Sequence, residues 1–214
     1  MSRYDTEQEQ MEAIKAWWNK NGTLLLSGVL IVAIAFAGWR YWQSYQYGQA
    51  ATASAMFEVL ELSQERGQFG EVSREARKLM QDQPASPYAG AAALMLAKFH
   101  WEKAEHQEAV DALNWILNAD QTDEMKLAAS MRLARLHIEL QQFDQAQSSL
   151  EKLASLVHSQ QQQANVDYIA ATMAFAQKDF SKAYEGFKSV FDNPQAPQDL
   201  RNLARLKMDD LTPK

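Results

Sequence analysis

Residues 96–117 read LAKFHWEKAEHQEAVDALNWIL, and the same pattern occurs twice more along the chain without a gap. The stretches LARLHIELQQFDQAQSSLEKLA at 133–154 and AATMAFAQKDFSKAYEGFKSVF at 170–191 each begin 37 residues after the one before. A fixed period of this length is typical of repeat proteins. Small residues let paired helices approach closely, and larger apolar residues fill the space between them. The small positions are Ala97, Ala134, Ala171, Ala109, Ala146 and Ala183, and the large ones are Leu113, Leu150, Phe187, Ile116, Leu153 and Val190.

Each repeat contains two helical stretches separated by a short polar turn, EKAEHQ, LQQFDQ or QKDFSK. A connection this short joins antiparallel helices, so each repeat is predicted to be a helical hairpin. One period earlier, residues 50–80 form a degraded fourth unit with Gly67 and Gly70 in its turn. The sequence therefore predicts an all-α fold of about four hairpins, in a repeat domain that spans 43–214.

Prolines mark the boundaries of this array. Ser86-Pro87 suits the N-cap and first turn of the helix that follows residue 86. Pro194 and Pro197 break the chain after the last repeat, and one more amphipathic helix is expected beyond them. A single helix at the end of a repeat array covers its open apolar face, so we expect a C-terminal capping helix.

The composition excludes several classes of protein. The chain has no cysteine, which rules out disulfide scaffolds, cysteine nucleophiles and thiolate metal sites. Residues 1–47 carry four basic and four acidic residues, and the remainder carries 17 basic and 23 acidic ones. The net charge of −6 lies in the predicted repeat domain. We therefore expect no nucleic-acid partner, because a phosphate backbone would repel this domain.

An apolar segment precedes the repeats, and we predict a transmembrane helix over 21–42. No charged residue lies between Asn21 and Trp39, and a helix of that length is about 28 Å long. Aromatic residues and one arginine flank the segment at positions where membrane interfaces favour them. These predicted interface anchors are Trp17, Trp18, Trp39, Arg40, Tyr41 and Trp42.

Residues 1–20 are predicted to form a tail on the cytoplasmic side of the membrane. Three basic residues precede the span and only Arg40 follows it closely, a bias that places the N-terminus in the cytoplasm and the repeats outside it. Met11, Ile14 and Trp18 lie on one face of a short amphipathic helix, and the alternative is an ordinary solvated tail. Asn21-Gly22 is expected to separate this helix from the span.

A second alternative concerns the apolar segment itself. Ala35-Phe36-Ala37 is similar to the cleavage site of a signal peptide, which would release the repeat domain from the membrane. The stretch ahead of the apolar run is long and carries four acidic residues, and cleavage would separate the second aromatic group from the first. Both features favour a retained anchor.

The small and large positions of the hairpins resemble the tetratricopeptide repeat, although the family's tryptophan near the unit start and its first-helix glycine are missing. The acidic tail, the motif GWRYW at 38–42 and the following repeats together resemble the family of YfgM-like ancillary subunits of the bacterial SecYEG translocon. This resemblance implies an inner-membrane protein with a periplasmic repeat domain, associated with SecYEG and with the periplasmic chaperone PpiD. It further implies a role as a scaffold or chaperone-like subunit, with emerging secretory chains as further partners.

The first helix of each tetratricopeptide unit lines the concave face, so the 37-residue register predicts a binding groove for a peptide or partner helix. The alternative is that Trp101, Ile138 and Phe175 only pack between neighbouring units. The predicted groove residues form three rows: Leu94, Met131 and Tyr168; Lys98, Arg135 and Thr172; and Trp101, Ile138 and Phe175.

The sequence predicts neither a catalytic nor a metal site, and no cofactor is expected. His100 and His137 share a register position, but the third repeat has Ala174 there, so hydrogen-bonded or packed histidines are favoured over metal ligands. Acidic pairs such as Asp123-Glu124 lie where helices begin or end, as expected of solvated residues that face a helix dipole. The alternative to a translocon subunit is a periplasmic repeat adaptor in envelope assembly or cell division that is not tied to secretion.

Overall fold

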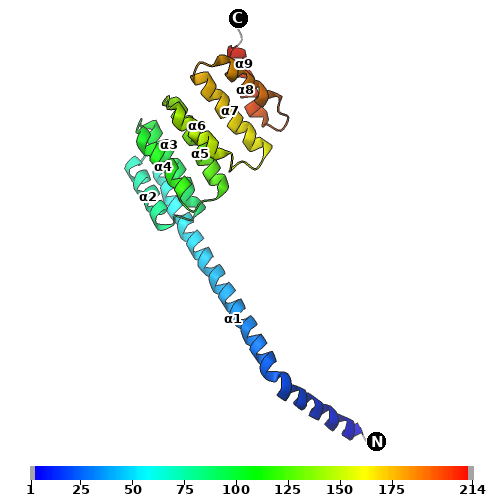
Figure 1. Cartoon of the computed structure of the whole chain (residues 1–214). Helices are drawn as coiled ribbons and strands as arrows, with labels where there is room; N and C mark the ends of the chain where they lie inside the picture. Colours follow the sequence, from blue (N-terminus) through cyan, green and yellow to red (C-terminus); the bar gives the residue numbers. More distant parts are fainter. Residues whose placement is uncertain (1–2, 212–214) are drawn as a thin grey trace. The chain divides into compact units, whose positions relative to one another are not determined.

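The computed structural model describes the backbone of residues 3–211 and the side chains of residues 10–211. All regular structure in this part of the chain is helical, as the repeat pattern predicts. The chain divides into two units, Met1–Thr52 and Ala53–Lys214 (Figure 1). The helices are α1 (Arg3–Glu65), α2 (Phe69–Asp82), α3 (Pro87–Glu102), α4 (His106–Asn118), α5 (Asp123–Glu139), α6 (Phe143–Leu153), α7 (Gln160–Ala176), α8 (Phe180–Asp192) and α9 (Gln198–Leu211).

Helix α1 contains the whole apolar segment and continues into the repeat domain. The predicted break at Asn21-Gly22 is wrong, because α1 passes through these residues without interruption. The Asn21 side chain donates a hydrogen bond to the carbonyl oxygen of Trp17, at 3.2 Å, and so supports the helix instead of ending it. The indole of Trp18 lies over Gly22, where an added Cβ would come within 3.0 Å of the ring. The absence of a side chain at Gly22 thus leaves room for the Trp18 ring on the helix surface.

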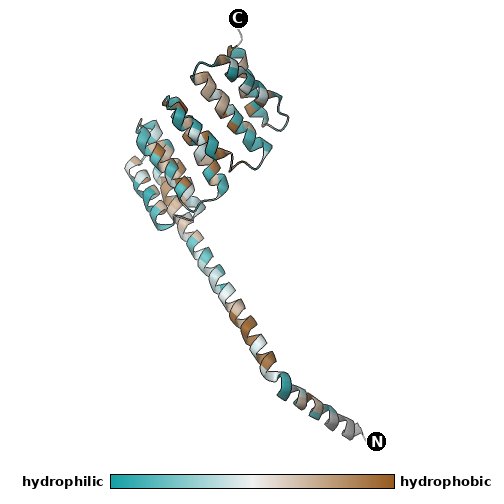
Figure 2. Ribbon diagram, viewed as in Figure 1, coloured by the Kyte–Doolittle hydropathy of each residue, from teal (hydrophilic) through white to brown (hydrophobic). Residues whose placement is uncertain are grey.

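The apolar segment of α1 makes a candidate membrane span. The region Gln10–Glu65 includes a window with a mean hydropathy of 2.1, of which only 6% is buried. Figure 2 shows this window as a brown section of the helix. A soluble protein would bury so apolar a surface, whereas a lipid bilayer covers it without any protein contact. The exposure of these side chains therefore supports an anchor in a membrane.

The second unit is built from four hairpins. The last part of α1 pairs with α2 through the buried side chains Ala53, Leu60, Val72 and Ala76, and the next three hairpins are α3/α4, α5/α6 and α7/α8. Each first helix also contacts the next one, α3 with α5, α5 with α7 and α7 with α9. Within the described residues, α4, α6 and α8 do not contact one another directly. Only the first helices thus form a continuous surface, which confirms the predicted solenoid.

The turns inside the four hairpins have the same backbone geometry at intervals of 37 residues. A residue with a positive φ lies in each turn: Gly67 (67°), Ala104 (60°), Gln141 (59°) and Lys178 (64°). The next amide donates to a carbonyl five residues earlier, as in Glu105 to His100 and Asp179 to Ala174. This pair of features defines a Schellman C-cap, and three residues separate the two helices of each hairpin. Glycine provides the left-handed conformation freely in only one of the four turns.

The first helices of the complete repeats begin with side-chain caps. Ser86, Thr122 and Ser159 each accept a hydrogen bond from an amide in the first turn of α3, α5 and α7, respectively. Pro87 follows Ser86 as the first helical residue, which confirms the predicted helix start. The buried side chain of Gln121 donates to the carbonyl oxygens of Pro84, at 2.6 Å, and Ser86, at 3.0 Å. One loop is thus tied to the loop one repeat earlier.

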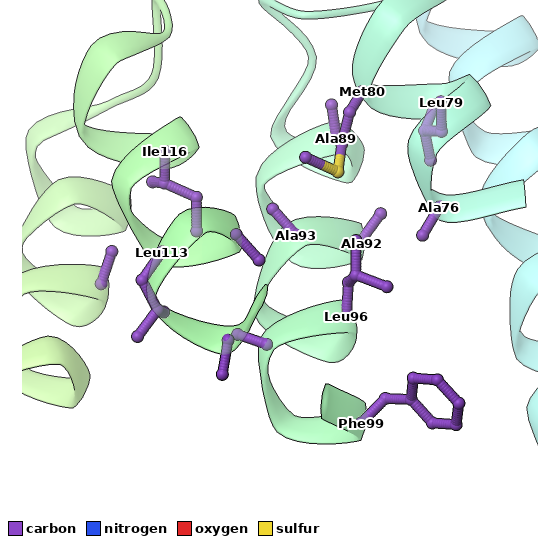
Figure 3. Packing of buried hydrophobic residues seen from close by; sticks show 14 of the residues in the cluster. Ala76, Leu79, Met80, Ala89, Ala92, Ala93, Leu96, Phe99, Leu113 and Ile116 are labelled. Carbon is purple, nitrogen blue, oxygen red and sulfur yellow. The ribbon is translucent and has the colours of Figure 1, made fainter. Parts of the chain in front are cut away.

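The core lies where the small and large repeat positions predict it. Alanines such as Ala89, Ala92 and Ala93 are fully buried on α3 and let α2 and α4 approach closely. Figure 3 shows larger side chains, among them Leu79 and Leu113, filling the space beside these alanines. At the other end, α9 contacts both α7 and α8 and buries Leu200 and Ala204. This arrangement confirms the predicted capping helix.

Candidate protein-binding groove

An open groove lies between the first helices α3 and α5. Its volume is about 430 Å³, within the range of pockets that bind small ligands or side chains. The carboxyl end of α1 and one residue of α4 complete its walls. The lining residues are Gln64, Leu94, Met95, Ala97, Lys98, Trp101, Leu113, Arg132, Arg135, Leu136 and Glu139.

Four of the nine predicted groove residues lie in this groove. Leu94 and Trp101 are half-buried on α3, where both also pack against the core. Lys98 and Arg135 are exposed, and they place a cation on each of the two helices. The Trp101 ring contacts His106, with 4.6 Å between ring centroids. The indole is therefore held in place while one side of it still faces the groove.

The other five predicted residues lie outside this groove. Ile138 is only 5% exposed and packs in the core with α6 and α7, and Met131 packs against the same cluster. Their places on the helix are therefore core positions. On α7, Tyr168 lies against Phe187, the Thr172 hydroxyl donates to the carbonyl oxygen of Tyr168, and Phe175 contacts Phe180 and Lys207.

The register reasoning missed several groove residues, chiefly Arg132, Leu136 and Glu139. The groove lies between two parallel helices, so it is lined by the edge of α3 that faces α5 and by the opposite edge of α5, which faces α3. Residues at the same register position lie on the same edge of both helices, so the register alone does not find both walls. One residue along a helix turns the side chain by about 100°. On α5 the groove edge is thus displaced by one residue from the predicted row, from Met131 to Arg132. The spacing of 132, 135, 136 and 139 on one helix face was the available signal.

Positive charge gathers on this groove. Lys98 pairs with Glu102 at 3.7 Å, but neither Arg132 nor Arg135 forms an ion pair or side-chain hydrogen bond with any residue that the structure describes. Partial burial and the neighbouring charge of Arg135 lower the pKa of the Arg132 guanidinium from its ordinary value. Glu139 is the only acidic residue among those that line the groove.

His100 and His137, which occupy the same register position, each form a hydrogen bond across a hairpin turn. His100 is 6% exposed, and its Nδ1 lies 2.5 Å from the carboxylate of Glu105. His137 is 9% exposed, and its Nδ1 lies 2.8 Å from the side-chain oxygen of Gln142. Glu105 and Gln142 are the N-caps of α4 and α6, so each histidine joins a first helix to the start of its second helix. The structure confirms hydrogen-bonded histidines here.

The predicted interface anchors are all exposed on α1. The exposed fractions are 52% for Trp17, 48% for Trp18, 68% for Trp39, 76% for Tyr41 and 59% for Trp42. Arg40 is exposed as well. Rings of this kind stay in contact with the interface when they lie at both ends of an apolar segment. Their role as anchors remains a prediction.

Comparisons with known proteins agree with this architecture. The sequence model of a family described as a tetratricopeptide repeat-like domain matches residues 15–213. The ancillary SecYEG translocon subunit of Escherichia coli strain K12 is 31% identical over 154 residues, which cover 72% of this chain and 73% of that protein. The chain belongs to the family of ancillary SecYEG translocon subunits. Proteins of the same name from Aggregatibacter actinomycetemcomitans and Haemophilus influenzae are 25% and 28% identical and cover 96% and 81% of the chain, and 97% and 89% of their own lengths.

No solved structure matches this chain. Ancillary translocon subunits with tetratricopeptide-like repeats are accessory proteins by name, and nothing in these comparisons indicates an enzyme. In the part of the chain that the structure describes, no three His, Cys, Asp or Glu side chains cluster in a way that could hold a metal ion. The groove on α3 and α5 combines apolar and basic lining residues, which suits it to binding another molecule.

Proposed function

We propose that the protein is an inner-membrane accessory subunit of the Sec translocon that binds partner proteins through the groove between α3 and α5. The open groove carries this proposal, because it combines a half-buried aromatic ring with cations on two helices. Aromatic and arginine side chains contribute a large share of binding energy in protein interfaces. The named relatives support SecYEG as the partner, and the sequence resemblance supports the chaperone PpiD and emerging secretory chains.

The proposal places the N-terminus in the cytoplasm and the repeat domain in the periplasm. Lys15 and Lys20 precede the apolar segment, and Arg40 follows it. Basic residues are retained on the cytoplasmic side, which supports this direction. Anchoring the groove beside the translocon raises its effective concentration for partners, so a modest intrinsic affinity is sufficient. The protein thus acts as a scaffold or chaperone-like partner at the membrane.

Orientation can be tested with single cysteines, because the chain contains none of its own. Glu12→Cys lies before the apolar segment and Gln107→Cys lies at an exposed position of α4. In intact cells with a permeabilised outer membrane, a membrane-impermeant maleimide should label Gln107→Cys and leave Glu12→Cys unlabelled until the inner membrane is opened. The reverse pattern would contradict the proposed direction.

Partner binding can be tested by site-specific photocrosslinking from the full chain in native membranes. A benzophenone amino acid replaces Trp101 in the groove, and a matched control replaces the exposed Glu108 on α4. We expect adducts with SecYEG subunits or PpiD from position 101 and few from position 108. Groove adducts that contain neither partner would overturn the proposal and favour the adaptor in envelope assembly or division. Equal adducts from both positions would assign binding to another surface.

A further inference from the structure

The groove is basic although the domain that carries it is acidic. Lys98, Arg132 and Arg135 face the groove against the single carboxylate of Glu139. The chain as a whole has 27 acidic and 21 basic residues. Most of the charged surface therefore repels an acidic partner, and the groove is a local exception. Such a contrast directs an acidic chain toward one place on the surface.

The two arginines lack an internal partner. They lie three residues apart on α5, so their side chains lie on adjacent turns of the same face. Like charges at this spacing repel each other, and no ion pair joins either guanidinium to a carboxylate of the described residues, although Glu139 lines the same groove. Partial burial is the main cause of the lowered pKa of the Arg132 guanidinium, and the charge of Arg135 adds to it. A bound carboxylate would offset both effects.

Apolar side chains complete the groove. Leu94 and the indole of Trp101 line the α3 side, and Leu136 lines the α5 side next to Arg135. Leu136 is only 8% exposed, so it forms part of the floor. A partner that satisfied only the charges would leave this apolar surface in contact with water and would forgo the stabilisation gained by burying it. The groove therefore suits a ligand with both acidic and apolar groups.

We propose that the groove between α3 and α5 takes an acidic, amphipathic segment of a partner protein, with Asp or Glu carboxylates on Arg132 and Arg135 and an apolar side chain against Trp101. This inference rests on the proposed function, namely that the groove binds protein. A guanidinium offers paired N–H donors that match the two oxygens of a carboxylate. Two carboxylates about one helical turn apart, or on alternate residues of an extended segment, can each meet one arginine. A protein segment fits better than a lipid surface, because the cations lie in a concave site with an apolar floor.

The test is a selection from a pool of random-sequence peptides with the full chain in nanodiscs of zwitterionic lipid. Peptides that bind the native protein should be enriched several-fold in Asp and Glu together with apolar residues. The double variant Arg132→Glu/Arg135→Glu should lose these peptides and select Lys- and Arg-rich ones instead. Lys152→Glu/Arg205→Glu makes the same change in net charge at exposed positions of α6 and α9, and it should keep the acidic selection.

Binding measurements on one selected peptide make the result quantitative. Replacing its acidic residues by Gln or Asn should weaken binding about tenfold or more, because charge-assisted pairs are lost. Arg132→Lys/Arg135→Lys keeps the charge without the paired donors and should give an intermediate affinity. If charge reversal lowers the helix content, the neutral variant Arg132→Gln/Arg135→Gln takes the place of the charge-reversal variant in these experiments. A pool without enrichment of acidic residues, or equal enrichment with the reversed groove, would overturn the inference.

The outcomes separate this inference from the proposed function. If position 101 still crosslinks SecYEG or PpiD but the selected peptides are neutral, the groove binds translocon partners by apolar contacts alone and the inference fails. If acidic peptides are selected but position 101 reaches neither partner, the inference stands and the proposed function fails. Vesicles containing phosphatidylglycerol are a third arm. Arginine-dependent vesicle binding without selection of acidic peptides would assign the groove to lipid and overturn the inference.

Discussion

The α3–α5 region and the α7–α9 region have the same repeat register, but their register-equivalent side chains pack differently. Leu94 on α3 lines an open groove, whereas its register equivalent on α7, Tyr168, packs against the fully buried ring of Phe187. Trp101 contacts His106 and faces the same groove, whereas Phe175 contacts both Phe180 and Lys207. The first region thus has an open groove, whereas the half-buried rings of the second, here called the closed region, pack against α8 and Lys207.

The difference follows from the neighbours of each first helix. Helix α7 contacts α9, which takes the place of the next repeat and closes the array, and α8 supplies Phe187 at a position where α4 has Leu113. The larger ring contacts Tyr168, whereas Leu113 borders the groove beside α3. Equal register thus fixes which residues lie on a helix face, and the size of the opposing side chain decides whether that face stays free. The following substitutions test this account, from the largest expected effect to the smallest.

Removing the ring of Phe187 should have the largest effect on stability. Phe187→Ala leaves a cavity among fully buried side chains, and we expect the free energy of unfolding to fall by about 3–5 kcal/mol. Leu113→Ala removes a smaller side chain that already borders the groove, and it should cost about 2–3 kcal/mol. Urea unfolding of the full chain in detergent, followed by far-UV circular dichroism, measures both. A loss for Leu113→Ala as large as that for Phe187→Ala would contradict the contrast between open and closed regions.

Helices α7 and α8 approach each other closely at Gly186. A Cβ at this position would lie 2.8 Å from the Cβ of Ala171 and 3.3 Å from its Cα, whereas the register equivalent on α4 is Ala112. We expect Gly186→Ala to lower the free energy of unfolding by about 1–3 kcal/mol, although alanine favours helices. Adding Ala171→Gly should restore much of this loss. The matched control is Gly70→Ala, where nothing lies within 4 Å and a gain of about 0.5–1 kcal/mol is expected.

The hairpin turns should respond alike in both regions, because their backbones are alike. Ala104→Gly and Lys178→Gly each relieve a left-handed residue, and each should raise the free energy of unfolding by about 1 kcal/mol. Gln177→Gly is the control, because its φ of −76° already suits an ordinary residue. Thermal unfolding of the three variants measures the effect. A gain in one turn but not in the other would show that tertiary contacts, and not the local backbone, control these turns.

The sequence predicts the hairpins well and the groove only in part. Sequential small and large residues at a 37-residue spacing indicate each helix pair, since close packing demands those sizes. The left-handed residues Ala104, Gln141 and Lys178 leave no such signal in the sequence. Backbone hydrogen bonds of the Schellman motif stabilise their conformation, and the identity of the side chain does not. Arg132 was missed because the register does not reveal which edge of α5 faces α3. The break expected at Asn21-Gly22 is absent because Asn21 bonds within the helix.

The smallest effect concerns the pH dependence of the closed region. Burial against Phe187 raises the pKa of the Tyr168 hydroxyl, and the positive charge of Arg135 opposes this shift in part. The fold therefore favours the neutral phenol. Its contribution to stability is fully present below the tyrosine's ordinary pKa of about 10 and is lost as the pH rises through the raised value. Tyr168→Phe should accordingly lose less stability at alkaline pH than the native chain.

Tyrosinate absorbance supplies the direct measurement of this titration. The difference between the native chain and Tyr168→Phe isolates one hydroxyl among seven tyrosines, and its midpoint should lie above that of an exposed tyrosine. Arg135→Gln should move this midpoint higher still, because the opposing charge is gone. An unshifted midpoint would mean that the α7 face is solvated like the α3 face. The open and closed regions would then differ in sequence but not in packing.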